Sequence, residues 1–230
     1  MPQQRDLNRT RERIMAAAQK EFAASGFAGA RTDAIARRAH VNERMIFYCF
    51  ESKEGLYRAL LAQKLSAKTA MIESTPDEDY TSSLVNGFAT CCDDVDTLRM
   101  WQWEALDQSG RKLVAEEERR AHFQAEVARW RRAKASGALP ADVDEEMLLL
   151  VGGALRTFPL TFPQLISLVT GMDPQDPEFR RKWSTWLEWV GRRLLAPTTK
   201  SGNKIDAKAT RSKKRSPSRA AAGSRRHQGS

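Results

Sequence analysis

The chain has 230 residues, which is enough for a small module and one larger helical domain. Two of its three cysteines are adjacent, which argues against a disulfide framework and fits a reducing compartment. The N-terminus lacks the apolar core of a secretory signal, and the longest apolar run, residues 147–155, is too short to cross a bilayer. We therefore expect a cytoplasmic protein.

The net charge of +9 is unevenly distributed along the chain. Residues 1–60 carry 11 Lys or Arg against 7 Asp or Glu, residues 61–199 carry 17 against 21, and residues 200–230 carry 10 against 1. A basic N-terminal segment and a basic tail indicate a polyanionic partner.

Three short helices are expected at the start of the chain. Apolar residues recur at steps of three and four over residues 8–25, and Gly26 ends the pattern. Thr32 is a hydroxyl N-cap for a second helix, and Asn42 can cap a third that runs to about Cys49. The size and spacing predict a helix-turn-helix DNA-binding domain over residues 1–52.

Further helices are expected over residues 53–197, the larger domain. Ser52 caps a long helix that runs to about residue 72, and others are predicted at about 79–92, 95–108, 112–136, 142–168 and 174–195. Pro159 and Pro163 must kink or interrupt the segment 142–168. The fold class is therefore all-α with about nine helices, followed by a disordered basic tail at residues 198–230.

Residues 32–56 resemble the DNA-binding signature of the tetracycline-repressor (TetR) family. The matching features, in chain order, are Thr32, the pair Ile35-Ala36, Val41, the aromatic pair Phe47-Tyr48, Phe50, Ser52-Lys53-Glu54 and Leu56. With the preceding helix, the resemblance covers residues 9–60, about a quarter of the chain. The chain departs from the family at His40 (commonly glycine), Arg44 (commonly glycine or a small residue) and Phe47 (usually tyrosine), so the operator sequence cannot be transferred from relatives.

A helix that begins near Asn42 can present its first turn to base edges in the major groove, and Arg44 is the best candidate for a bidentate contact to guanine. By resemblance, Phe47 and Tyr48 flank phosphates and sugars, whereas Thr32 and Lys53 lie at helix N-termini that favour phosphate. Plain N-capping by Thr32 and a solvated charge at Glu43 remain open alternatives. The predicted DNA-contacting residues are Thr32, Asn42, Glu43, Arg44, Met45, Phe47, Tyr48 and Lys53.

The resemblance also implies an effector pocket and a homodimer formed through the eighth and ninth helices. Candidate pocket residues are Phe88, Cys91, Met100, Trp101, Trp103, Phe123, Trp130 and Phe158, although core packing explains each of them equally well. Candidate dimer residues are Trp183, Trp186, Leu187, Val190 and Leu194.

These expectations predict a sequence-specific regulator, a repressor released from a palindromic operator by a small-molecule effector. An alternative is a non-specific architectural protein that binds nucleic acid through the basic tail. Catalysis is not expected, because the three histidines are not at metal-ligand spacing and the chain shows neither a glycine-rich phosphate loop nor a nucleophile-base set. No metal or cofactor is predicted.

Overall fold

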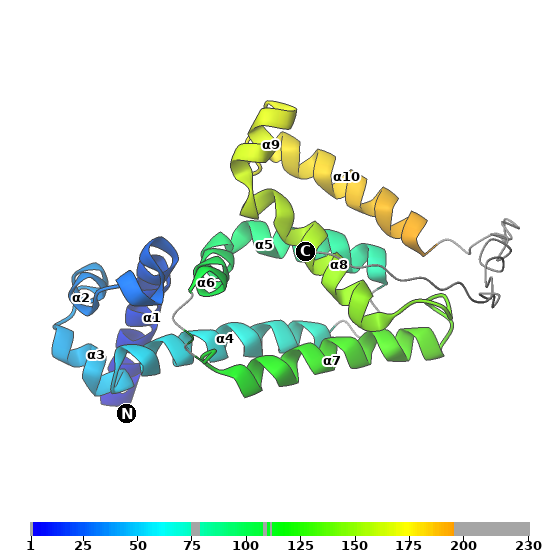
Figure 1. The fold of residues 1–230 in the computed structure, drawn as a ribbon. Coiled ribbons are helices and arrows are strands. Elements are labelled where there is room, and N and C mark those ends of the chain that lie inside the picture. Colours follow the sequence, from blue (N-terminus) through cyan, green and yellow to red (C-terminus); the bar gives the residue numbers. More distant parts are fainter. Residues whose placement is uncertain (1, 75–78, 108–109, 111, 196–230) are drawn as a thin grey trace, which may run out of the picture. The chain divides into compact units, whose positions relative to one another are not determined.

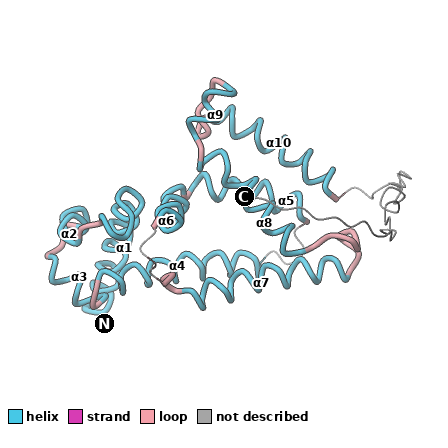
Figure 2. Tube along the Cα trace, viewed as in Figure 1, coloured by secondary structure: helices cyan, strands magenta, loops and turns pink. Residues whose placement is uncertain are grey.

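The computed structural model describes residues 2–74, 79–107, 110 and 112–195, and every regular element in these ranges is a helix (Figures 1 and 2). The predicted tail at residues 198–230 lies outside the described residues. The helices are α1 (Pro2–Gly29), α2 (Thr32–Ala39), α3 (Glu43–Phe50), α4 (Lys53–Ser74), α5 (Tyr80–Asp93), α6 (Val95–Leu106), α7 (Glu116–Ala135), α8 (Glu145–Thr161), α9 (Pro163–Thr170) and α10 (Pro177–Leu194).

The first three helices and the start of α4 enclose one apolar core. Ile14 and Phe22 of α1 meet Ile35 of α2 and Ile46 of α3 there, and all four side chains are fully buried. Complete burial of such a side chain contributes about 1.5–3 kcal/mol to folding. We call α1–α3 the head and α4–α10 the body.

Local capping signals explain where α3 and α4 begin. The Asn42 side chain accepts a hydrogen bond from the Arg44 amide at 2.9 Å, and Ser52 accepts one from the Gly55 amide at 2.9 Å, which confirms both predicted caps. The predicted cap at Thr32 is wrong: Arg31 occupies the cap position, and its side chain makes no cap hydrogen bond. Thr32 is instead the first residue of α2, where its hydroxyl is free to bond elsewhere.

The turn between α2 and α3 uses a histidine where a glycine was expected to be favoured. His40 has a φ of 52°, in the left-handed region that a side chain adopts only at some cost. The Arg13 guanidinium of α1 donates to the carbonyls of both Ala39 and His40, the latter at 2.9 Å. These bonds stabilise the turn from outside the helix-turn-helix itself.

The body is organised around α5. This helix packs against α8 and α10, while α4 and α7 lie side by side (Figure 1). Tyr80, Leu84 and Phe88 of α5 form the body core with residues of α7 and α10, including Trp130 and Leu187. The described residues therefore form two apolar cores, and the first, the head core, also takes in side chains of α4 and Met100 of α6.

The described ranges contain ten helices, where nine were expected. Pro159 lies inside α8 without ending it, but the chain breaks at Phe162 and Pro163 starts a separate helix, α9. Proline removes a backbone donor and fixes φ, so it is favoured at a first helical position. No single described helix has the length and apolar composition needed to cross a membrane, although α8 and α9 taken together do and meet at 78°.

Candidate DNA-binding surface and effector region

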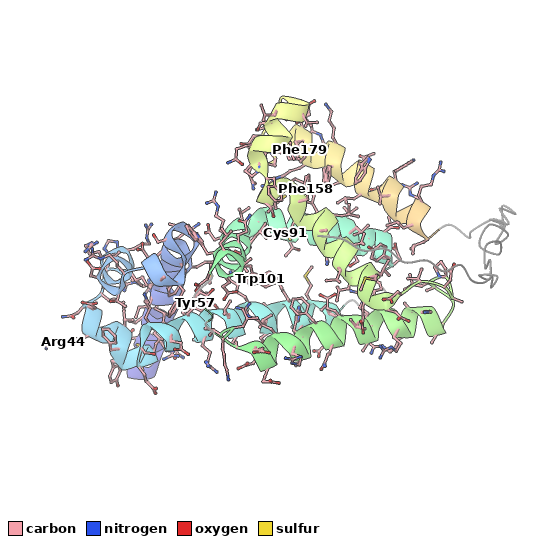
Figure 3. The ribbon with its side chains drawn as sticks, in the orientation of Figure 1. Arg44, Tyr57, Cys91, Trp101, Phe158 and Phe179 are labelled. Carbon is pink, nitrogen blue, oxygen red and sulfur yellow. The ribbon has the colours of Figure 1, made fainter. Side chains whose placement is uncertain are left out.

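The first turn of α3 presents one long cationic side chain to solvent. Arg44 is exposed and points away from the rest of the head (Figure 3). Its guanidinium makes no hydrogen bond or ion pair to a described residue. An unpaired guanidinium at the start of a short exposed helix can bond two acceptors of a guanine edge at once.

Glu43 bonds to α2 in the structure. Its carboxylate accepts a hydrogen bond of 2.5 Å from the Thr32 hydroxyl, and both side chains are partly buried. This contact connects the start of α3 to the start of α2 and fixes the angle between the two helices. The Thr32 hydroxyl, which was expected to contact a DNA phosphate, therefore bonds Glu43 in this structure.

The other predicted DNA-contacting residues divide by exposure. Tyr48 is 73% exposed and Phe47 is 44% exposed, so both are available at the end of α3. Met45 is partly buried and packs against the head core. The Lys53 ammonium donates to the Ala30 carbonyl at 3.0 Å and lies 4.8 Å from the centre of the Phe27 ring, so it stabilises the junction of α4 with the head.

Sequence reasoning missed two arginines on α1 that support the recognition helix. Arg11 donates to the Cys49 carbonyl near the C-terminus of α3 and stacks on the Phe50 ring at 4.4 Å, and Arg13 supports the turn at His40. A cation at a helix C-terminus is favoured by the helix dipole. The sequence does not distinguish these arginines from their neighbours Arg5 and Arg9.

The predicted pocket residues fall into different environments. Phe88 and Trp130 are buried in the body core, and Met100 is buried in the head core. Phe158 is 38% exposed on α8. These four residues do not gather around one site.

Trp101 and Phe123 contact each other, and Cys91 lies near Lys68, which also contacts Trp101. The Trp101 and Phe123 rings meet edge to face at a centroid distance of 6.4 Å, and Cys91 is partly buried on α5 (Figure 3). Two cations that were not predicted, Lys68 of α4 and Arg156 of α8, lie near them, and Lys68 stacks on the Trp101 ring at 4.7 Å. This group is the body's best candidate for an effector contact.

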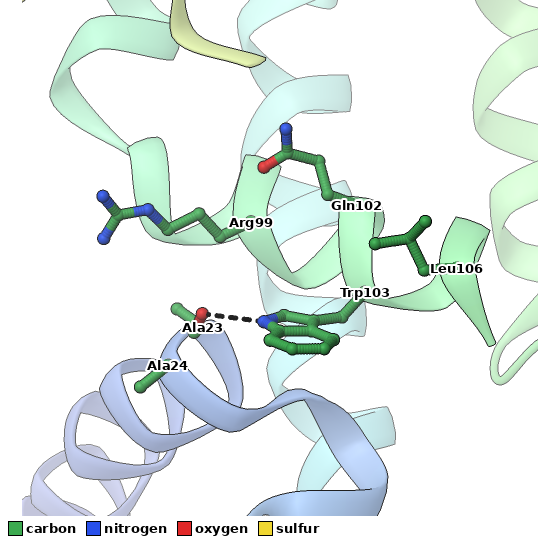
Figure 4. A pocket seen from close by; sticks show the side chains of 6 residues that line it. All are labelled: Ala23, Ala24, Arg99, Gln102, Trp103 and Leu106. Carbon is green, nitrogen blue, oxygen red and sulfur yellow. Dashed lines mark hydrogen bonds between the residues drawn. The ribbon is translucent and has the colours of Figure 1, made fainter. Parts of the chain in front are cut away.

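Trp103 connects body and head and is not part of that group. Its indole nitrogen donates to the Ala23 carbonyl of α1 at 3.2 Å, and its ring lies over Gly26 (Figure 4). A Cβ at Gly26 would be 3.1 Å from the ring, and the φ of 66° already favours glycine there. Beside this contact lies a groove of about 400 Å³ between α1 and α6, lined by Arg99, Gln102 and Leu106 of α6 among others.

A polar network also joins α6 to its neighbours. The Tyr57 hydroxyl of α4 donates to Glu104 at 2.7 Å, and Arg119 of α7 makes two bonds of 2.7 and 2.8 Å to the same carboxylate. At the other end of α6, Asp94 accepts from Gln19 of α1 and from Lys64 of α4, at 2.5 and 2.9 Å. The segment formed by Asp94 and α6 therefore contacts the head, α4 and α7 at once.

Exposed apolar side chains are concentrated on the last three helices. Trp186 and Leu194 of the predicted dimer residues are exposed, whereas Trp183 and Val190 are partly buried and Leu187 is fully buried in this chain's own core. Leu187 is therefore not accessible to another subunit. The exposed apolar residues of these helices are Met147, Leu150, Val151 and Phe158 on α8, Phe162 before α9, Leu165, Leu168 and Val169 on α9, and Trp186, Trp189 and Leu194 on α10.

Helices are the only regular elements among the described residues, and a capped third helix with an exposed arginine in its first turn is the geometry of a helix-turn-helix DNA-binding protein. Two family models match it: one for bacterial regulatory proteins of the tetR family over residues 14–60, and one for a tetracyclin repressor-like C-terminal domain over residues 78–192. The chain belongs to the TetR family. The predictions of family, fold class and regulatory role are confirmed.

The chain is similar to curated regulators and to solved structures. It is 29% identical over 169 residues to the HTH-type transcriptional repressor SCO4008 of Streptomyces coelicolor, covering 73% of this chain and 86% of the relative. A putative transcriptional regulator from the same organism, SCO4942, superposes with a TM-score of 0.66 at 24% identity, covering 81% of this chain and 98% of that one. FadR of Bacillus subtilis, solved with stearoyl-CoA, superposes with a TM-score of 0.59 at 16% identity, covering 80% and 97%.

Proposed function

We propose that this protein is a homodimeric repressor that binds a palindromic operator through α3 and leaves it when a small molecule binds the body. The observation that carries the proposal is the exposed, unpaired guanidinium of Arg44 in the first turn of α3. Asn42 supports it by fixing the backbone of that turn, and Phe47 and Tyr48 follow on the exposed end of the helix. Such a protein works in the cytoplasm.

The proposed contacts to DNA fall into two groups. Arg44 reads a base edge, while Tyr48 reaches a phosphate or sugar with its exposed hydroxyl. Glu43 and Thr32 position α3 through their mutual hydrogen bond, and Lys53 positions the head against α4. The proposal assigns DNA binding to residues 1–52 and effector binding and dimerisation to residues 53–197.

The proposed dimer uses the exposed apolar residues of α8, α9 and α10. Water-exposed apolar surface on three successive helices is unfavourable in a lone chain and is removed when a second copy covers it. Dimers with two-fold symmetry recognise two half-sites about 34–36 Å apart, which is one turn of DNA. The operator is then an inverted repeat.

The release step is supported by the contacts of α6. A relative of the same fold is solved with stearoyl-CoA, and in this chain the candidate effector residue Trp101 lies on the same helix as Trp103, which contacts α1. A ligand that displaces α6 alters the spacing of the two heads. A hundredfold loss of operator affinity requires a coupling free energy of only about 2.7 kcal/mol.

Selection of bound duplexes from a random DNA pool tests the proposal. The expected result is an inverted repeat with half-site centres one helical turn apart, bound in preference to random competitor duplex. A pool without enrichment, bound only in a salt-sensitive and sequence-independent manner, would favour the architectural alternative and reject the repressor.

A further inference from the structure

Four helices bring two cations together in the interior of the body. Lys68 of α4 lies over the Trp101 ring of α6, and Lys68 and Arg156 of α8 both act electrostatically on Cys91 of α5. Burial lowers the pKa of Lys68 below its usual value, and repulsion by Arg156 lowers it further. The two cations therefore act on each other, and both are partly buried.

The position of Arg156 depends on a glycine in α5. A Cβ at Gly87 would lie 2.3 Å from Cδ of Arg156, so any other residue would displace the arginine side chain. The Arg156 Nε donates to the Gly152 carbonyl at 3.1 Å, which orients the guanidinium. Gly87 and Cys91 are four residues apart and share a face of α5, so Arg156 lies on the side of α5 that carries Cys91.

Neither cation has a carboxylate partner within ion-pair distance among residues 2–74, 79–107, 110 and 112–195. Two carboxylates act on Lys68 from farther away: Asp94, which is paired with Lys64 at 2.9 Å, and Glu126, which lies 3.7 Å from the buried His122. Burial raises the pKa of the Cys91 thiol, so it is not an anion at neutral pH. A shielded cation without a counter-charge destabilises a protein unless something else supplies the charge.

A third group in the same region lacks a partner. The indole nitrogen of Trp101 is buried and makes no hydrogen bond. Buried donors in proteins are nearly always bonded, and an orphaned donor indicates an acceptor that is absent. Two cations without a carboxylate partner within ion-pair distance favour an anion, and an oxygen of the same anion can accept the hydrogen bond of the unpaired N–H donor.

We propose that the effector is an organic anion whose carboxylate or phosphate is bound by Lys68 and Arg156, with its apolar part against Trp101 and Phe123. This inference rests on the proposed function, because it specifies the chemical class of ligand for the effector site. Arginine bonds a carboxylate or a phosphate with two N–H groups, and lysine adds a second positive charge. The ring edges of Trp101 and Phe123 provide the apolar wall.

Four probes with the same flexible alkyl chain test the charge preference: dodecanoate, dodecyl phosphate, dodecanol and dodecyltrimethylammonium, each below its micellar concentration. Binding to the full chain, without DNA, is measured by calorimetry and by tryptophan fluorescence. At least one anion is expected to bind ten times more tightly than both the alcohol and the cation, and the tighter anion identifies the headgroup. Equal affinity across the panel, or binding of neither anion, would overturn the inference.

Lys68→Met and Arg156→Met are each expected to abolish the preference for the anion. Lys64→Met is the matched control, one turn away on α4, because Lys64 is paired with Asp94; it should retain the preference. Without ligand, Lys68→Met is expected to raise Tm, since it removes an unpaired cation, whereas Lys64→Met lowers Tm. A Lys68→Met protein with lower Tm, or a Lys64→Met protein with equal loss of preference, would contradict the proposed site.

These measurements separate the two proposals. A protein that binds an operator but shows no preference for anions retains the proposed function and loses this inference. An anion preference that depends on Lys68 and Arg156 supports the inference even if DNA selection rejects the repressor.

Discussion

In the proposed complex with DNA, Arg44 is the residue on which sequence recognition depends most directly. Arg44→Ala is expected to cost about 1–3 kcal/mol of operator binding per half-site and to relax discrimination at one base pair, because a bidentate guanine contact is lost. Fluorescence anisotropy with the selected operator and with single-base variants measures both effects. Arg120→Ala on α7, where the arginine is exposed and paired with Glu116, is the matched control and should leave affinity unchanged.

His122 makes the stability of the body depend on pH. It is 5% exposed, its Nδ1 lies 2.9 Å from the Thr69 hydroxyl, and burial lowers its pKa below 6.5, while Glu126 partly opposes that shift. The unfolded chain therefore takes up a proton at higher pH than the folded one, and folding stability falls as pH drops below about 6.5.

The prediction concerns the slope of unfolding free energy against pH. His122→Gln should reduce the loss of stability between pH 7 and pH 5, measured by urea denaturation, because the amide does not titrate. His40→Asn, which removes an exposed histidine at a left-handed position that asparagine tolerates, is the control. A slope that His122→Gln leaves unchanged would contradict this role.

At the scale of elements, α6 connects the head to the rest of the body, and in the proposed release step it transmits the effect of the ligand to the head. It contacts α1 through Trp103, α4 and α7 through Glu104, and both α1 and α4 through Asp94 just before its first residue. These contacts are hydrogen bonds with defined directions, so a shift of α6 cannot leave the other helices unaffected. In the proposed release step, the head and the body therefore move together.

Trp103→Ala is expected to weaken the coupling between the two sites. It removes the bond to Ala23 and the packing on Gly26 but touches neither α3 nor the Lys68 region. The variant should still bind the operator alone and the effector alone. It should lose most of the coupling free energy between the two binding events, which is about 1–3 kcal/mol. The measurement is operator affinity with and without saturating effector.

Leu106→Ala provides the comparison for that experiment. Leu106 lines the same groove on the same helix but is 71% exposed (Figure 4). In the Leu106→Ala variant, the effector should lower operator affinity as much as it does in the unchanged protein. If the effector lowers operator affinity equally in the Trp103→Ala variant and in the unchanged protein, α6 does not transmit effector binding to the head through Trp103.

At the scale of the whole molecule, exposed apolar surface on the last helices predicts association. Leu150 is 64% exposed on α8, and Leu150→Arg is expected to convert a dimer into a monomer by placing a charge in the interface. Sedimentation velocity measures the change, which should be accompanied by weaker operator binding. Leu113→Arg is the control, because Leu113 is also an exposed leucine (51%) but lies outside the last three helices; this variant should remain a dimer. A monomeric unchanged protein at micromolar concentration would disprove the dimer.

The basic segment 200–230 lies outside the described residues, but its charge permits a prediction. Truncation after Thr199 should reduce the dependence of operator affinity on salt, since each phosphate contact that is lost lowers the slope by about 0.9. Base preference should be unaffected. A truncated protein with the original slope would show that the tail does not bind DNA.

The parts of the fold and of the candidate site that depend on contacts between residues close together in the sequence were predictable. The caps at Asn42 and Ser52 and the interruption at Pro163 follow from bonds within one helical turn, which the sequence contains completely. Thr32 was assigned wrongly because its hydroxyl bonds Glu43, eleven positions later, across the angle between two helices. No local pattern indicates that angle.

The sequence by itself determined that this chain forms short capped helices at its start, long helices afterwards, and a turn that presents Arg44. Only the tertiary structure decided what each helix face meets. Met100 and Trp101 are neighbours, yet Met100 is buried in the head core and Trp101 contacts Lys68 and Phe123 in the body. One residue turns a helix by about 100°, so adjacent side chains meet different partners, and those partners are chosen by packing between segments far apart in the sequence.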